Sequence, residues 1–168
     1  MTTVHTTLDS PLGELVLTGR RDASAPGGLV LATLAVRGGR GGTDRPAGDR
    51  DDAAFAAVAE QLDAYFAGTL TRFDLACAES GSPFERRVWE VLDTIPYGTT
   101  TTYGAVTGRI GEPPGAARRV GAAIGANPLL VVRPCHRVIG ADGSLTGYAA
   151  GPERKQRLLA LEGATLPL

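Results

Sequence analysis

The sequence has few of the residues that build disulfide frameworks, metal centres or membrane spans. Only two cysteines, Cys77 and Cys135, and two histidines occur in 168 residues. Thiols this sparse exclude the disulfide framework of a small secreted domain and argue against a Cys/His zinc cluster. No apolar run approaches the about 20 residues that span a bilayer, and residues 1–10 lack the basic and apolar regions of a secretory signal. We therefore expect a cytoplasmic protein without a metal, a cofactor or a membrane partner.

A surplus of positive charge, common in chains that bind nucleic acids, is also missing overall, since the formal net charge is −1. The charge is unevenly divided, however. Residues 1–79 carry 7 Lys and Arg against 11 Asp and Glu, whereas residues 80–168 carry 10 against 7. This asymmetry favours an anionic partner on the basic C-terminal part, although an ordinary solvated surface also produces differences of this size.

The pattern of apolar residues in 1–79 predicts a small α/β unit. Alternating apolar residues flank the turn Ser10-Pro11-Leu12-Gly13, which indicates a hairpin. Further on, apolar residues recur at three- and four-residue steps until Gly68, which stops the expected helix. The pattern predicts a hairpin of two strands, 4–8 and 15–17, and a further strand at 29–36. It then predicts a mobile Gly/Arg/Asp-rich loop at 37–52, a helix at 52–68 and a last strand at 73–77.

Residues 80–168 predict a mainly helical unit that begins after a small, polar boundary segment at 78–82. Ser82 and Glu85 have the spacing of a capping box at the start of one helix, and Pro96 ends it. Two short helices with a Gly/Pro turn between them have the spacing of a helix-turn-helix. The expected helices are 83–95, 103–109, 115–126 and 152–163.

The third of these helices consists mainly of Gly and Ala, with Arg118 and Arg119 in its middle. Side chains this small let another backbone approach closely. That backbone belongs either to a neighbouring helix or to the sugar-phosphate edge of a DNA groove. The two arginines favour DNA.

The segment Arg133-Pro134-Cys135-His136-Arg137 places a thiol beside a histidine and two arginines. It follows an apolar run, 128–132, that predicts a short buried strand ended by the proline. A thiol reacts as the thiolate, which neighbouring cations or a basic histidine favour. Cys135 could instead be an inert core residue, but the neighbouring histidine and arginines favour a reactive thiol. Glu162, near the end of the last helix, is poorly placed for the helix dipole and needs a partner, for which His136 is the candidate.

The motif Pro134-Cys135-His136-Arg137-Val138, preceded by Asn127-Pro128 and followed by Gly147-Tyr148, resembles the signature of the O6-alkylguanine-DNA alkyltransferases. These are the methylated-DNA–protein-cysteine methyltransferases, and the likeness runs from about Phe84 to Gly163. It implies an α/β, RNase H-like N-terminal subdomain in 1–79. It also implies a mainly helical DNA-binding and alkyl-acceptor subdomain with a helix-turn-helix in 80–168. The implied protein is a monomer that acts on double-stranded DNA carrying O6-alkylguanine, and also on O4-alkylthymine.

The resemblance also implies a role for each matching residue. Cys135 is the acceptor, which takes the alkyl group once and irreversibly. His136 deprotonates it through a water, Glu162 orients the histidine, and Asn127 binds backbone between the helix-turn-helix and the cysteine motif. The residues implied to bind the extruded base are Tyr103, Val138, Tyr148, Ala149 and Ala150. Those implied to contact DNA are Thr102, Ala116, Ala117, Arg118 (which fills the space the base leaves), Arg119 and Gly121.

Four residues depart from the usual family pattern: Arg133, Arg119 and the pair Ala149-Ala150. Arg133 is expected to affect either the thiolate or the contact with DNA, and Arg119 the fit to the groove. The alanine pair is expected to affect the pocket size and the range of alkyl groups accepted. Three other classes of function are compatible with parts of the chain. An alkyltransferase-like recognition protein would lack Cys135. A cysteine hydrolase would draw its base from a distant segment. A helix-turn-helix regulator would need an effector site that the sequence does not provide.

Overall fold

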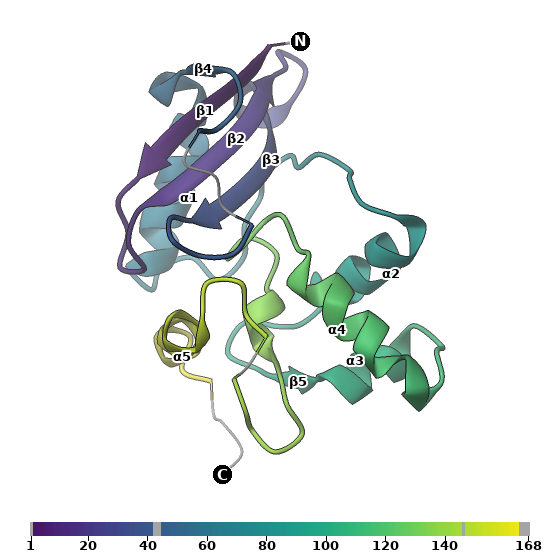
Figure 1. The fold of residues 1–168 in the computed structure, drawn as a ribbon. Coiled ribbons are helices and arrows are strands. Elements are labelled where there is room, and N and C mark those ends of the chain that lie inside the picture. Colours follow the sequence, from purple (N-terminus) through teal and green to yellow (C-terminus); the bar gives the residue numbers. More distant parts are fainter. Residues whose placement is uncertain (1, 42–44, 146, 165–168) are drawn as a thin grey trace. The chain divides into compact units, whose positions relative to one another are not determined.

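The computed structural model describes residues 2–41, 45–145 and 147–164, and the chain forms two compact units, Met1–Glu79 and Ser80–Leu168 (Figure 1). The first unit contains a four-stranded mixed sheet of order β3-β2-β1-β4, in which only the β1/β4 pair is parallel. Its elements are β1 (Thr3–Leu8), β2 (Leu15–Arg21), the 3₁₀-helix η1 (Pro26–Gly28), β3 (Leu29–Val36), β4 (Asp49–Arg50), the 3₁₀-helix η2 (Asp52–Phe55) and α1 (Ala56–Phe66).

The predicted hairpin, third strand and helix of this unit are confirmed. The hairpin turn is closed by a bond from the Gly13 amide to the Ser10 carbonyl, and Gly13 has a φ of 104°, which favours glycine. Figure 1 shows α1 behind the sheet, and Phe55, Leu62 and Tyr65 are buried there. Burial of these large apolar side chains is the main stabilising contribution to this unit.

Two expectations for the first unit need correction. The strand expected at 73–77 is wrong: only an isolated bridge joins Cys77 to Leu31. The Gln61 side chain donates to the Asp74 carbonyl and accepts from the Asp74 amide, so these groups do not pair with a neighbouring strand. The expected mobile loop at 37–52 includes β4, which pairs with β1, while 42–44 lie outside the described residues.

The second unit is mainly helical, and the four predicted helices are confirmed with small shifts of their ends. No helix in the described part of the chain is long and apolar enough to cross a membrane. A parallel pair of two-residue strands, β5 and β6, was not predicted. The elements are α2 (Pro83–Leu92), β5 (Thr101–Thr102), α3 (Tyr103–Arg109), the 3₁₀-helix η3 (Pro114–Ala116), α4 (Ala117–Gly125), the 3₁₀-helix η4 (Cys135–Arg137), β6 (Val138–Ile139) and α5 (Pro152–Leu161).

Helix α2 anchors the interior of the second unit. Its start has the predicted capping box, with Ser82 Oγ accepting from the Glu85 amide and the Glu85 carboxylate accepting from the Ser82 amide. On its buried face, Trp89 Nε1 donates to the Ala123 carbonyl of α4 at 2.9 Å. The only tryptophan therefore packs in the core and links α2 to α4.

The apolar run at 128–132 is buried but is not the expected strand. It forms consecutive turns in which the Val132 amide donates to Leu130 and the Arg133 amide donates to Leu129. Val131 has a φ of 70°, which is the only positive φ outside glycine in the described ranges. A short apolar run shows that a segment is buried without fixing its backbone. The tight path of this run leads directly into η4.

Candidate active site

The segment that carries Cys135 is shaped by the side chain of Asn127. Its Oδ1 accepts from the Leu129 amide at 3.0 Å, and its Nδ2 donates to the carbonyls of Leu129 and Arg133 at 3.3 and 3.0 Å. The Cys135 amide then donates to the same Arg133 carbonyl at 2.8 Å. Asn127 is buried, so each of these bonds replaces water for a group that would otherwise be unsatisfied. Asn127 thus fixes the turn that presents the cysteine.

Cys135 is 4% exposed at the start of η4. Burial raises the pKa of its thiol to about 11, while a hydrogen bond with Asn127 and the charges of Lys155 and Arg133 oppose that rise. At neutral pH the resting group is therefore the thiol. A nucleophile buried in this form needs a base that can take its proton.

His136 and Glu162 form a buried pair, with His136 Nε2 2.8 Å from Glu162 Oε2 and both side chains 0% exposed. Burial lowers the pKa of His136, and the bond to Glu162 opposes that change. The neutral imidazole can donate Nε2–H to the carboxylate, which leaves a lone pair on Nδ1. Nδ1 has no hydrogen-bond partner among the described residues. The pair therefore offers a buried, oriented proton acceptor on the residue next to Cys135.

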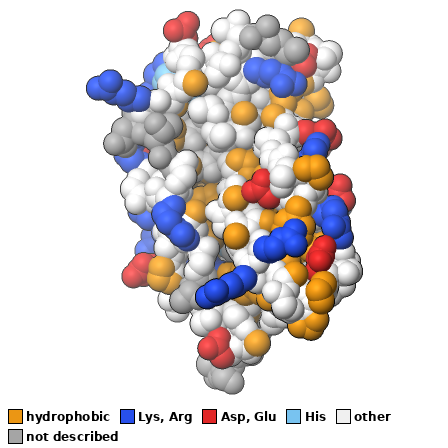
Figure 2. All heavy atoms as spheres, turned by 45° about the vertical axis from the view of Figure 1, so that its right-hand side comes forward, with side chains coloured by type: hydrophobic (Ala, Val, Ile, Leu, Met, Phe, Trp, Pro, Cys, Tyr) orange, Lys and Arg blue, Asp and Glu red, His pale blue; other side chains and the backbone are white. Residues whose placement is uncertain are grey.

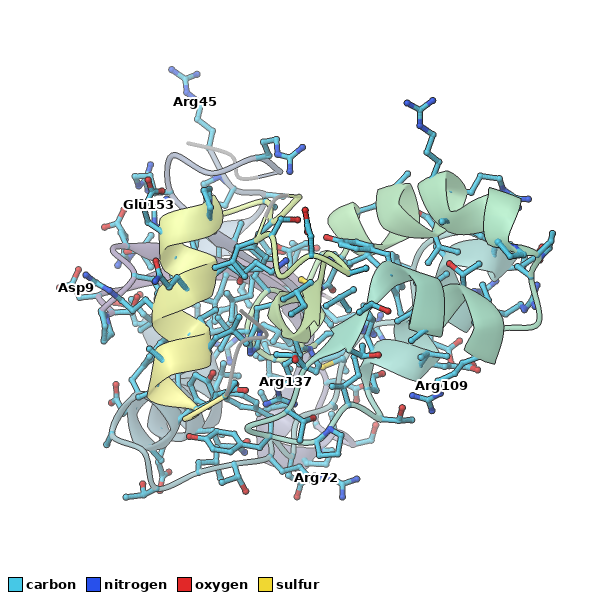
Figure 3. The ribbon with its side chains drawn as sticks, turned by 90° about the horizontal axis from the view of Figure 1, so that it is seen from below. Asp9, Arg45, Arg72, Arg109, Arg137 and Glu153 are labelled. Atoms are coloured by element: carbon cyan, nitrogen blue, oxygen red, sulfur yellow. The ribbon has the colours of Figure 1, made fainter. Side chains whose placement is uncertain are left out.

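Arg137 is the second partner of Glu162, and sequence reasoning missed it. Its Nε and Nη2 donate to the two carboxylate oxygens at 2.8 and 3.0 Å, and its Nη1 donates to the Ile95 carbonyl at 2.6 Å. Arg137 is 7% exposed, whereas Figure 3 shows Arg109 pointing outward. The expected contact of Glu162 with His136 is present, but this carboxylate is shared between a histidine and an arginine.

Lys155 on α5 is also buried near the cysteine, at 1% exposure, and no pattern in the sequence indicates this. Burial lowers its pKa to about 8, and the interaction with Cys135 opposes that change. Its Nζ lies 5.9 Å from the centre of the Tyr103 ring. Burial also raises the pKa of the Tyr103 hydroxyl, and the charge of a Cys135 thiolate would raise it further. Lys155 and Tyr103 therefore interact electrostatically with Cys135 from α5 and α3.

The residues expected to bind a base come from three segments: the start of α3, the start of β6 and the loop before α5. Val138 and Tyr148 are buried, Ala150 is buried and Ala149 is half-buried. The Tyr148 ring stands edge-on to His136 with centroids 6.5 Å apart. Next to Tyr148, Gly147 approaches Tyr103 so closely that a Cβ there would lie 2.9 Å from the hydroxyl oxygen. The loop before α5 and the start of α3 therefore meet at Gly147.

The residues expected to contact DNA are not all on the surface. Arg118 and Arg119 are exposed on α4, and the Arg119 guanidinium lies 4.2 Å above the Phe84 ring. Lys and Arg side chains also lie beside hydrophobic ones on the face drawn in Figure 2. By contrast, Ala116 is buried, and Thr102 caps α3 by accepting from the Ala105 amide. The remaining two positions, on α4, are half-buried: Ala117 and Gly121.

Arg133, one of the departures from the family pattern, lies along α2. Its guanidinium is 4.9 Å from the centre of the Trp89 ring, and its Nε is 3.4 Å from Asp93 Oδ1. Its side chain is 15% exposed. Arg133 can occupy a largely buried position because its flat guanidinium stacks on the ring and pairs with the carboxylate.

Comparison with known proteins assigns the family. A Mycolicibacterium paratuberculosis protein named methylated-DNA–protein-cysteine methyltransferase is 51% identical over 158 residues, which are 94% of this chain and 91% of that protein. This chain belongs to the methylated-DNA–protein-cysteine methyltransferase family. A Mycobacterium bovis protein of the same name is 46% identical over 163 residues, covering 97% of this chain and 94% of that one. The family model described as "6-O-methylguanine DNA methyltransferase, DNA binding domain" matches residues 83–164.

A solved structure supports the same assignment. The crystal structure of Mycobacterium tuberculosis OGT in complex with DNA matches with a TM-score of 0.85 and 46% identity, over 95% of this chain and 92% of that chain. The identity spans both units, so the resemblance that was specific only after Phe84 in the sequence extends to the whole chain.

Proposed function

We propose that this protein repairs double-stranded DNA by moving the alkyl group from O6 of an alkylguanine to Cys135, once per molecule. The observation that carries the proposal is the buried cysteine followed by the His136–Glu162 pair, in a chain of this family. A nucleophile, a base and a group that orients the base are the parts that thiol activation needs.

The chemistry is a single displacement. The Cys135 proton passes to His136 Nδ1 through a water, while Glu162 holds the opposite nitrogen and stabilises the imidazolium that forms. The sulfur attacks the alkyl carbon in line, so that the S–C bond forms as the C–O6 bond breaks. The electron pair of that bond remains on guanine, which takes up a proton, with the Tyr103 hydroxyl as the proton donor to N3. A thioether is not hydrolysed, so each molecule reacts once.

Access to the alkyl group requires the base to leave the DNA stack, because an atom inside the duplex cannot be attacked in line. We propose that α3 and α4 act as a helix-turn-helix in the minor groove, with Arg118 filling the space of the extruded base. The exposure of Arg118 and Arg119, together with the small side chains of α4, supports this assignment. Thr102, Ala116, Ala117 and Gly121 are proposed to shape the same contact; two of them, Thr102 and Ala116, also have structural roles.

The extruded base is proposed to meet the backbone of Val138 and the side chains of Tyr148, Ala149 and Ala150. Small alanines there leave room for alkyl groups and suit guanine, and also thymine alkylated at O4. The first unit is proposed to be an RNase H-like subdomain, and the protein is proposed to act as a monomer. No cofactor has a role in this mechanism.

Intact-mass measurement tests the proposal. The protein is mixed with a duplex oligonucleotide that carries one O6-methylguanine, and its mass is followed with time. We expect one added methyl group in the parent protein and none in Cys135→Ser. Cys77→Ser is the matched control and should gain one methyl group, because Cys77 takes no part in the proposed reaction. Binding of the duplex without a mass change would instead indicate a recognition protein that does not transfer the group. Repeated turnover would reject suicidal transfer.

A further inference from the structure

The Arg137 guanidinium uses three nitrogens at once. Two of them hold the two oxygens of Glu162, and the third holds the Ile95 carbonyl after α2. The flat, two-point bond between a guanidinium and a carboxylate fixes the plane of the carboxylate. The Arg137 side chain is 9% exposed and that of Glu162 is 0% exposed, so water screens this bond very little. The orientation of Glu162 therefore depends on Arg137.

Arg137 balances the charge of the Glu162 carboxylate that it contacts. Glu162 contributes one negative charge, Arg137 one positive charge, and a neutral His136 none. If Arg137 were uncharged, the His136–Glu162 pair would carry a net negative charge in a buried place, and it would take up a proton at higher pH. A histidine that already holds this proton cannot accept another from the thiol.

We propose that Arg137 is a positioning residue for the transfer reaction: it holds Glu162 by both oxygens and cancels its charge, so that His136 stays neutral with Nδ1 as the acceptor. This inference rests on the proposed function, because a proton acceptor matters only if Cys135 must be activated. Arg137 does not touch the reacting atoms. It acts through Glu162 on the histidine.

Other charged and titratable groups face the same cluster and must be kept constant. Lys155 on α5 also lowers the pKa of His136, after Arg137 in size. Tyr148 faces the histidine edge-on, and Tyr97 faces the Arg137 guanidinium 5.7 Å from its ring centre. Arg133 acts on Cys135 and not on the pair. Arg137 is the cation that contacts both oxygens of the Glu162 carboxylate.

A purely structural role is the competing explanation, because Arg137 also links the end of α2 to Glu162 at the end of α5. Such a role would lower stability and rate in every variant without moving the titration of His136. The two explanations therefore differ in a property that can be measured directly. The chain has two histidines, and His5→Gln leaves the ring signals of His136 alone in a carbon-13 NMR titration.

The variants separate charge from geometry. Arg137→Met removes both, and Arg137→Lys keeps the charge but not the two-point bond. In the His5→Gln background, we expect Arg137→Met to raise the midpoint of the His136 titration by about one pH unit or more. The acidic limb of the single-turnover rate profile should move by the same amount. Arg137→Lys should leave the midpoint near that of the parent and lower the maximal rate at least several-fold.

A double variant supplies the control. Arg137→Met with Glu162→Gln removes both charges and should return the midpoint to or below that of the parent. The proposal is overturned if Arg137→Met keeps the parent midpoint while its near-ultraviolet circular dichroism is unchanged. If Arg137→Met does not fold, transfer at the parent rate by Arg137→Lys overturns it. The NMR titration needs no DNA and therefore tests Arg137 independently of the transfer reaction. A shifted midpoint without methyl transfer would reject the proposed function but would still support the effect of Arg137 on the His136–Glu162 pair.

Discussion

The side-chain Nδ2 of Asn127 donates to the carbonyl oxygen of Arg133 at 3.0 Å, and this bond closes the loop that presents Cys135. The same side chain also binds both backbone groups of Leu129. One buried amide therefore shapes the segment between α4 and the acceptor.

Replacement of Asn127 by alanine should lower both stability and transfer rate. The buried Leu129 amide would lose its partner, which costs about 1–3 kcal/mol, and the turn into Cys135 would loosen. Ser10→Ala is the matched control, because Ser10 Oγ accepts from the Leu12 amide in a similar turn of the other unit. Urea denaturation and single-turnover transfer should show that Ser10→Ala affects only stability. Equal rates for Asn127→Ala and the parent would contradict this role.

Lys155 should make stability depend on pH in the alkaline range. Its pKa is about 8 in the folded chain and ordinarily 10.5, so between these values the unfolded chain binds more protons. Stability therefore rises with pH through this window. Cys135, with a raised pKa, contributes the opposite slope above its ordinary value of 9.0, so the measurement belongs in a Cys135→Ser background.

In that background, Lys155→Met should be more stable than the lysine form at neutral pH, because a buried charge without a carboxylate has been removed. The difference should shrink as the pH rises from 8 toward 10.5. With Cys135 restored, the same substitution should slow transfer, since the charge that favours the thiolate is lost. A difference in stability that does not change between pH 7 and 10 would show that Lys155 titrates normally.

Gly147→Ala should slow transfer as well as destabilise the protein. Its φ of 88° costs an L-residue roughly 1–2 kcal/mol, and the new methyl group would displace the Tyr103 hydroxyl. Gly68→Ala is the matched control, with a φ of 80° and nothing within 4 Å of the added Cβ. Both variants should lose similar backbone stability in thermal denaturation. Only Gly147→Ala should lose rate, and a normal rate would show that Tyr103 is not needed in its present place.

Arg133→Leu should lower the stability of the protein only modestly. Its pair with Asp93 is long at 3.4 Å and the aspartate is 53% exposed, so a double-mutant cycle should give a coupling of less than about 1 kcal/mol. Stacking on Trp89 adds an amount of similar size. Burial raises the pKa of Asp93 while Arg133 opposes that rise, so the carboxylate should titrate at higher pH in the leucine variant. NMR titration of Asp93 checks the direction, and a fall would contradict it.

Features with a local cause could be predicted from the sequence. The capping box of α2 depends on residues three positions apart, and the hairpin turn depends on a glycine with positive φ. The apolar run at 128–132 was misassigned because burial there is combined with a positive φ at Val131, which no periodicity reveals. Pairing of β5 with β6 joins segments far apart in the chain, and two-residue strands carry no pattern of their own.

The residues of the candidate site also divide into those that the sequence could predict and those that it could not. Cys135 and His136 are adjacent, so their motif was visible, and Glu162 was found because a carboxylate at a helix end needs a partner. Arg137 was visible only as a cation, because its contact with Glu162 joins residues 25 positions apart. Lys155 was not predicted, because a lysine is ordinarily exposed and only the packing of α5 buries this one.

The most direct test of the account follows a carbon-13-labelled methyl group from O6-methylguanine to its final atom. The protein is incubated with increasing excess of the labelled duplex, digested, and its peptides are weighed and fragmented. We expect a plateau at one label per molecule, carried by the sulfur of Cys135. A label on Cys77 or another side chain, or release of labelled methanol with continued turnover, would contradict it.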